Sequence, residues 1–177
     1  LAMIAISIYI WFRFEWQFGV GALFALIHDV TLTLGFFALT QLEFDLNTVA
    51  AILTIIGYSL NDTIVVYDRI RENLRKYRKM EMAEILNLSI NETLSRTIVT
   101  SVSMMIALGT LVVLGGSVLF GFSVAMLLGI VVGTFSSIFV GAPLLLWMGV
   151  SSDSFVASEA SAEDRVKAKK AIERGQV

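Results

Sequence analysis

Residues 118–148 read VLFGFSVAMLLGIVVGTFSSIFVGAPLLLWM and contain no charged side chain. A helix needs roughly 20 mostly apolar residues to cross a bilayer, so this run is long enough to span it with a tilt or bend. Pro143 predicts a kink near its end. Three further runs have about the length of a span, at 19–40, 46–67 and 97–114. The sequence therefore predicts an all-α fold, a polytopic transmembrane helix bundle.

The composition agrees with this fold and excludes several kinds of site. Of the 177 residues, 56% are hydrophobic and 16% are charged, with a mean hydropathy of +0.80. Soluble domains are about 45–50% apolar and about 25% charged. The absence of cysteine excludes disulfides, thiolate metal sites and a cysteine nucleophile, and a single histidine excludes a multi-histidine metal cage. We expect no metal, no cofactor and no enzymatic activity.

Two segments flank the spans. Residues 1–12 are apolar but too short to cross a bilayer, which predicts that the chain begins partway through a helix and that further sequence precedes it. Residues 151–177 are rich in Ser and Ala and then in mixed charges, which is typical of a disordered extension. We expect a transmembrane domain over 1–150 and a cytoplasmic tail over 151–177.

The thirteen Lys and Arg residues predict the orientation. They follow the first run at Arg13, fall between residues 69 and 96, or lie in the tail, whereas the connections 41–45 and 115–117 contain none. Basic loops stay on the cytoplasmic side of a membrane. The pattern places the 68–96 segment and the C-terminus in the cytoplasm, and Glu43 and Asp45 outside. Because topology accounts for the basic residues, we predict no nucleic-acid partner.

The segment 68–96 shows a helical spacing of apolar residues. Ile70, Leu74 and Tyr77 recur at intervals of four and three, and a weaker stripe continues after a break near 79–81. This predicts two short amphipathic helices lying along the inner membrane face. They form either an interfacial connector whose basic residues meet anionic lipid, which we favour, or a docking surface for a cytoplasmic partner.

Small residues recur at every fourth position of the last run. In a helix they form one continuous groove that lets another helix approach closely, so we predict a helix-packing face. The spacing does not distinguish a fixed helix interface from one in which the two helices slide against each other. Its members are Gly121, Ala125, Gly129, Gly133, Ser137 and Gly141.

Charged residues inside the spans are the candidate functional residues, because a charge at membrane depth costs on the order of 2.5–3.5 kcal/mol. Asp62 lies six residues before Asp68, about 9 Å inside the cytoplasmic boundary. Arg96 lies at the cytoplasmic mouth of the next span and is placed to be its counter-charge. We interpret Asp62 as a proton carrier and Arg96 as its counter-charge. The alternatives are a structural ion pair or a polar helix clamp for Asp62, and contact with lipid phosphates for Arg96. The neighbours able to hold water around the carboxylate are Tyr58, Ser59, Asn61 and Thr63.

His28 and Asp29 lie about halfway along the span at 19–40. Adjacent residues point about 100° apart on a helix, so the two need not act as a pair. Each is either a member of a proton relay or a polar contact across a helix interface. We favour the interface, because polar contacts between membrane helices are common.

Four motifs carry a family resemblance. The stretch GYSLNDTIVVYDRIREN at 57–73 resembles the signature of SecF, the smaller subunit of the bacterial SecD–SecF protein-export complex. SRTIVTS at 95–101, FRFEW at 12–16 and ALIHDV at 25–30 are similar to SecF as well. The resemblance covers about residues 1–150. It implies one half of an assembly like the resistance–nodulation–division (RND) transporters, with this chain forming helices two to six of six and lacking the periplasmic domain.

The resemblance also implies a function. In SecF, the aspartate of the Asn-Asp motif and the arginine of the Ser-Arg-Thr motif are proton-pathway residues, and they match Asp62 and Arg96 here. The implied role is a proton-motive-force-coupled accessory subunit of the Sec translocon, which assists preprotein translocation across the bacterial inner membrane. The implied partners are SecD, the SecY–SecE–SecG translocon, YajC, YidC, the preprotein substrate through the periplasmic region, and the lipid bilayer.

Three alternatives to this function remain open. The chain could be a non-conducting membrane scaffold that stabilises the translocon, or a fragment of another RND-type transporter. A third alternative is an intramembrane aspartyl protease that uses Asp29 and Asp62. The usual Gly-x-Gly-Asp context is missing around both residues, which disfavours the protease.

Overall fold

The structure is a computed structural model that describes residues 16–150, and the predictions for 1–12 and for the tail 151–177 lie outside them. Four of its helical stretches, with the last running from Gly116 to Trp147, are long and apolar enough to cross a membrane. The predicted all-α bundle is confirmed. Its elements are α2 (Trp16–Thr40), α3 (Leu46–Lys76), α4 (Met82–Leu114), α5 (Gly116–Ser136), the π-helix η1 (Ser137–Gly141) and α6 (Ala142–Trp147).

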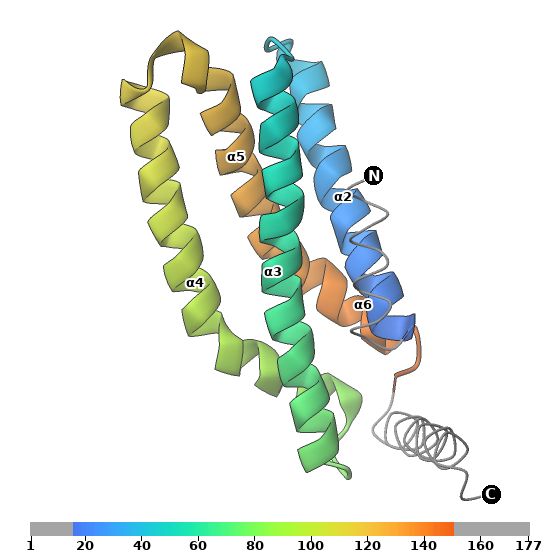
Figure 1. The fold of residues 1–177 in the computed structure, drawn as a ribbon. Coiled ribbons are helices and arrows are strands. Elements are labelled where there is room, and N and C mark those ends of the chain that lie inside the picture. Colours follow the sequence, from blue (N-terminus) through green and yellow to red (C-terminus); the bar gives the residue numbers. More distant parts are fainter. Residues whose placement is uncertain (1–15, 151–177) are drawn as a thin grey trace, which may run out of the picture.

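Helix α3 lies in the middle of the bundle, as Figure 1 shows, and α2 and α5 both pack against it. Helix α4 packs against both α5 and α3. The α2–α3 and α4–α5 connections lie at one end of the bundle, and the α3–α4 turn lies at the other (Figure 1).

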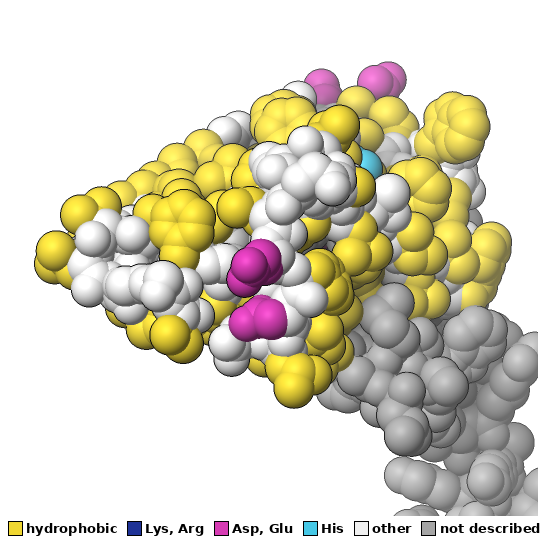
Figure 2. All heavy atoms as spheres, turned by 90° about the horizontal axis from the view of Figure 1, so that it is seen from above, with side chains coloured by type: hydrophobic (Ala, Val, Ile, Leu, Met, Phe, Trp, Pro, Cys, Tyr) yellow, Lys and Arg dark blue, Asp and Glu magenta, His cyan; other side chains and the backbone are white. Residues whose placement is uncertain are grey.

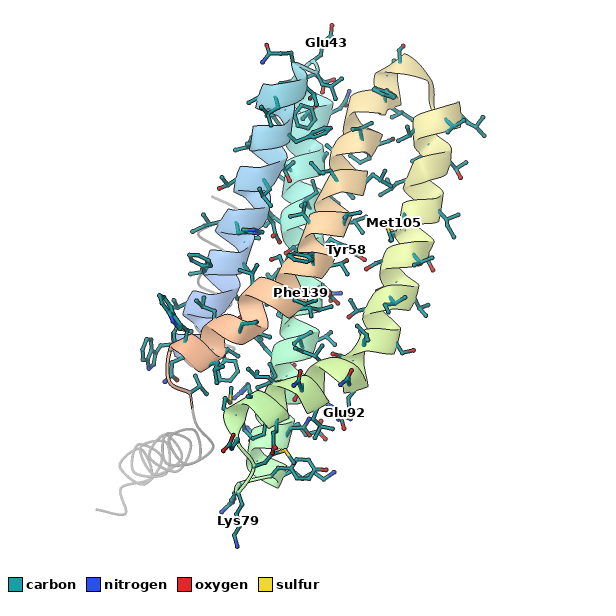
Figure 3. All side chains as sticks on the ribbon, turned by 180° about the vertical axis from the view of Figure 1, so that it is seen from behind. Glu43, Tyr58, Lys79, Glu92, Met105 and Phe139 are labelled. Carbon is teal, nitrogen blue, oxygen red and sulfur yellow. The ribbon has the colours of Figure 1, made fainter. Side chains whose placement is uncertain are left out.

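The two ends of the bundle differ in charge. The end with the α2–α3 connection carries Glu43 and Asp45, and no Lys or Arg of the described residues is visible there in Figure 2. All Lys and Arg residues within 16–150 fall between Arg69 and Arg96. Figure 3 places Glu43 at one end and Lys79 at the opposite end. The charge segregation read from the sequence is thus also a segregation in space.

Asp45 starts helix α3 as its N-cap. Its Oδ1 accepts a hydrogen bond from the Thr48 backbone N–H at 2.8 Å and another from Thr48 Oγ1 at 2.9 Å. A side-chain acceptor at this position satisfies a backbone donor that has no partner within the helix. The hydrogen bond from the Thr48 backbone is the main cause that lowers the pKa of the Asp45 carboxyl below its ordinary value of 3.8.

The cap predicts that the start of α3 loosens in acid. Because the pKa of Asp45 is lowered on folding, its stabilising effect is present above the ordinary value of 3.8 and is lost as the pH falls through the lowered value. We expect the Thr48 amide to lose protection from hydrogen exchange in that acid range, after correction for the intrinsic rate. Asp45→Asn caps without titrating, and retention of the acid-dependent loss in that variant would contradict the assignment.

The 68–96 segment differs from the prediction of two short, separate helices. Helix α3 continues without interruption to Lys76, and α4 begins at Met82, so the chain is non-helical only around 77–81. Ile70 and Leu74 of α3 and Ile85 and Leu86 of α4 are buried in one hydrophobic cluster. The two apolar stripes therefore bury each other in a helical hairpin that extends the membrane helices, because each stripe finds its apolar partner on the neighbouring helix.

The small-residue stripe of α5 and η1 lies largely against α3. Positions 121, 129 and 133 face Thr48, Ile55 and Ser59 of α3, and a Cβ added at Gly133 would sit 3.1 Å from the Cβ of Ser59. Ala125 and Ser137 are fully buried as well. Close backbone approach of the two helices is possible because these positions lack larger side chains.

Gly141 ends the π-helix that separates α5 from α6. The proline two residues later lacks an N–H and its ring clashes with the carbonyl four residues before it, so a regular α-helix cannot pass through this point. The irregular turn precedes Pro143, where the sequence predicted a kink. The fully buried Tyr67 donates a hydrogen bond from its hydroxyl to the Gly141 carbonyl at 2.8 Å and so ties α3 to this turn.

This hydrogen bond predicts a measurable loss of stability in Tyr67→Phe. We expect the free energy of unfolding to fall by about 1 kcal/mol, the usual net value of a buried hydrogen bond. The fraction that remains folded after heating in detergent measures it. Tyr58→Phe is the matched control, since the Tyr58 hydroxyl is only half-buried and its bond to Ser101 is longer, at 3.3 Å. An equal loss in both variants would contradict the proposed tie.

Candidate functional site

Asp62 is a buried carboxylate at the junction of three helices. It lies on α3 with 9% of its surface exposed. Thr97 of α4 donates a hydrogen bond to Oδ1 at 2.8 Å, and Ser137 of the π-helix donates one to Oδ2 at 2.8 Å. Each carboxylate oxygen thus holds a different neighbouring helix, so the side chain cross-links α3, α4 and η1.

A cavity of about 390 Å³ lies beside this carboxylate, between α3 and α4. Its lining combines hydroxyl and amide groups with apolar side chains, so it offers hydrogen-bonding partners to water near an otherwise buried acid. The lining residues are Tyr58, Asn61, Asp62, Val99, Thr100, Ser103 and Met104.

Arg96 does not pair with Asp62 in this structure. Its side chain is exposed, and among residues 16–150 no ion pair joins the two. Successive residues of a helix point about 100° apart, so Thr97 faces α3 while Arg96 points elsewhere. Arg96 instead lines a separate cavity of about 350 Å³ with Val65, Asp68, Arg69, Glu72, Glu92 and Thr93.

The predicted polar neighbours of Asp62 divide among several partners. The Tyr58 hydroxyl, at mid-height of the bundle in Figure 3, lies 3.3 Å from Ser101 Oγ. Ser101 Oγ in turn lies 2.7 Å from Thr134 Oγ1 of α5. Asn61 lines the cavity beside Asp62, and Thr63 is buried. The hydroxyls of Tyr58, Ser101 and Thr134 thus link α3, α4 and α5, but none of the predicted neighbours hydrogen-bonds to the carboxylate of Asp62.

His28 and Asp29 do contact each other. His28 Nδ1 lies 3.0 Å from Asp29 Oδ1, and Asp29 is fully buried. Ser59 of α3 donates a hydrogen bond to Asp29 Oδ2, so the favoured role of a polar contact across a helix interface agrees with the geometry. The sequence predicted that Ser59 lies near the carboxylate of Asp62. In the structure its hydroxyl hydrogen-bonds to Asp29 instead.

Thr97 and Ser137 are the partners of Asp62 that sequence reasoning missed. Thr97 follows directly after Arg96 in the Ser-Arg-Thr motif, where only the charged residue was considered a candidate. Ser137 was assigned only to the small-residue stripe. A hydroxyl that replaces Gly or Ala within such a stripe is the signal that could have identified it, since small packing positions need no polar group.

A charged cluster joins the ends of α3 and α4 next to the second cavity. Arg69 Nε donates to Glu92 at 2.7 Å, and Asn73 Nδ2 donates to the same carboxylate at 2.8 Å. Arg69 also donates to Glu72 at 2.6 Å. Part of this cluster is exposed to solvent, where such pairs contribute little to stability, so we assign it to the geometry of the hairpin. Residues 16–150 hold no group of three His, Cys, Asp or Glu side chains that could bind a metal ion.

Comparison with known proteins shows close similarity to protein-export subunits. A chain from Rickettsia bellii named protein translocase subunit SecF is 62% identical over 141 residues, which cover 80% of this chain and 46% of the relative. SecF of Rickettsia rickettsii is 58% identical over 144 residues, covering 81% and 47%. SecF of Cereibacter sphaeroides is 55% identical over 149 residues, covering 84% and 46%. The chain thus spans about half the length of these curated relatives.

A solved structure and a family model agree with these relatives. A crystal structure of SecDF in its super-membrane-facing form matches with a TM-score of 0.79 and 47% identity, covering 90% of this chain and 21% of that one. The model of the family "Protein export membrane protein SecD/SecF, C-terminal" matches residues 1–151. The chain therefore belongs to the SecD/SecF family of protein-export membrane proteins, and its relatives there are SecF subunits.

Proposed function

We propose that this chain is the membrane part of a proton-motive-force-coupled accessory subunit of the Sec translocon, which assists preprotein translocation across the bacterial inner membrane. The family supports the export role, since its relatives are named protein translocase subunit SecF. One observation supports the coupling to protons. Asp62 is a buried acid whose two oxygens are held by hydroxyl groups on two other helices.

The hydrogen bonds of Asp62 explain how a proton would move helices. An ionised carboxylate only accepts hydrogen bonds, so it uses the donors of both Thr97 and Ser137. A neutral carboxyl is a weaker acceptor and carries an O–H donor of its own, so both hydroxyl bonds weaken and one of them can reverse. Protonation thus changes the link from α3 to α4 or to η1. The cavity beside Asp62 offers a route for the proton.

Arg96 has a second role in this proposal. It is adjacent to Thr97, so a movement of α4 that releases Thr97 from Asp62 also moves the guanidinium. We propose that Arg96 enters the proton pathway in that rearranged state and faces the cleft near Glu92 and Asp68 in the present one. An ion pair between Asp62 and Arg96 is then a feature of one step of the cycle.

The orientation and the partners belong to the same proposal. The charge difference between the two ends supports a cytoplasmic location for the 69–96 end and an outside location for Glu43 and Asp45. The C-terminus is then cytoplasmic. The similar structure is a SecDF protein, which supports SecD as the partner. The SecY–SecE–SecG translocon, YajC, YidC and the preprotein follow from the export role.

Gradient-dependent export in inverted membrane vesicles tests this function. The full-length protein, assembled with its partner subunit, is compared with the Asp62→Asn variant with and without a proton gradient. The proposal requires that the variant lose the stimulation by the gradient. Undiminished stimulation in a fully assembled variant would leave the scaffold function as the better explanation.

A further inference from the structure

Helix α2 contains a second buried acid that the mechanism above does not use. His28 and Asp29 are the two titratable residues among its 25 residues. Asp29 is fully buried, whereas the side chain of His28 is 31% exposed. One oxygen of Asp29 lies 3.0 Å from His28 Nδ1, and the other accepts a hydrogen bond from Ser59. His28 thus lies at the surface of α2, and Asp29 lies at the interface between α2 and α3.

Among residues 16–150, no fixed cation faces Asp29 from the helices packed against α2. The sequences of α5, η1 and α6 contain no titratable residue. In the apolar part of α3 the titratable groups are Tyr58, Asp62 and Tyr67. The first basic residue of α3 is Arg69, ten residues after Ser59 and so about 15 Å further along the helix. Within the described part of the chain, the imidazole of His28 is therefore the group that can balance the charge of Asp29.

An isolated ionised carboxylate in an apolar interior is costly, and such a group either finds a cation or becomes neutral. A His–Asp dyad that holds one proton beyond the N–H of a neutral imidazole is neutral overall wherever that extra proton lies, on the imidazole or on the carboxyl. The dyad can therefore hold one proton at membrane depth without creating a net charge, and pass it between its two members at little electrostatic cost.

We propose that the His28–Asp29 dyad is a second proton-binding site of the bundle, loaded through the partly exposed imidazole of His28. In the loading step a proton binds His28 Nε2, and the proton on Nδ1 passes to Asp29 Oδ1. The imidazole ends neutral with its proton on Nε2, and the carboxyl ends neutral. One proton enters and one proton is stored, so the step balances.

The stored proton acts on α3 through Ser59. A neutral Asp29 accepts a weaker hydrogen bond from this hydroxyl, which joins α2 to α3, so the stored proton loosens that link. Ser59 lies one helical turn before Asp62 and packs against Gly133 of α5. Ser136, next to Ser137, has a buried hydroxyl with no hydrogen-bond partner among residues 16–150, so the junction holds an additional donor. The effect on export rests on the proposed function, whereas proton binding at the dyad does not.

Infrared spectroscopy of the full-length protein in its membrane complex tests the site. Aspartate labelled with carbon-13 at its carboxyl identifies the C=O stretch of neutral aspartic acid, and Asp29→Asn identifies the band that comes from Asp29. We expect this band to grow when the pH is stepped from about 8 to about 5, because the step supplies the proton that the dyad stores. In His28→Gln the band should no longer respond to that step, because the carboxyl has lost the group that exchanges its proton.

Two variants are the matched controls. Ser59→Ala removes the donor to Oδ2, so the Asp29 band should shift in frequency and keep its response to pH. This shift also identifies the band if Asp29→Asn does not assemble. Asp62→Asn should leave the response of Asp29 in place. An Asp29 band that is absent or constant at both pH values, or a response that persists in His28→Gln, would overturn the proposal. None of these spectra depends on export, so failure here is distinct from undiminished export in Asp62→Asn.

Discussion

Replacing Asp62 by Asn is expected to lower proton-gradient-dependent export by roughly tenfold or more, since coupling between two sites typically amounts to about 5–150-fold. The amide has nearly the same shape as the carboxylic acid but cannot exchange a proton. It can still accept from Thr97 or Ser137 through one oxygen, so the bundle should assemble. Stimulation of export by the gradient should disappear while the ATP-driven background remains.

Variants of neighbouring residues separate proton exchange from packing. Thr54→Ala changes an exposed residue of the same helix that does not line the cavity beside Asp62, and we expect export to change less than twofold, on the order of a surface substitution. Thr97→Ser retains the donor to Asp62 and should keep export, whereas Thr97→Val removes it and should reduce export. Co-purification of the partner subunit checks assembly. An assembled Asp62→Asn protein that exports like the native one would contradict the mechanism.

Replacing Gly129 by Ala is expected to reduce the free energy of unfolding by about 1–3 kcal/mol, the usual cost of overpacking a core. A Cβ at this position would lie closer than 3.0 Å to three side-chain carbons of Ile55. Ile55 is fully buried, and its branched side chain has little rotamer freedom with which to move away. Heating in detergent, followed by size-exclusion chromatography, measures the folded fraction.

Gly57→Ala is the matched control for this substitution. Gly57 is also within a membrane helix, but a Cβ there would meet no atom within 4 Å. We expect it to be neutral or stabilising by up to about 1 kcal/mol, because Ala favours helix more than Gly. Ile55→Ala combined with Gly129→Ala should lose less stability than the sum of the two single changes. Additive losses would show that contact with Ile55 is not the cause.

Much of the fold could be predicted from the sequence, because a helix that crosses a bilayer needs a long apolar run. Apolar runs of sufficient length predicted the spans, and the small-residue stripe predicted a face that lies against α3 in the structure. The hairpin at 68–96 was predicted less well. Its amphipathic stripes were assigned to the membrane surface, whereas Ile70 and Ile85 pack into one cluster. A stripe alone does not tell whether its partner is lipid or another helix.

The sequence by itself determined the helical class, the position of the spans, the charge of the two ends, and the presence of two acids in apolar surroundings. These follow from composition and spacing, because burying charge and unpaired backbone groups in lipid is costly whatever the neighbours are. Only the tertiary structure decided that Asp62 is held by Thr97 and Ser137, that Arg96 lies elsewhere, and that Asp29 pairs with His28 and Ser59. Hydrogen bonds depend on distances of about 3 Å and on direction, and helix rotation sets both.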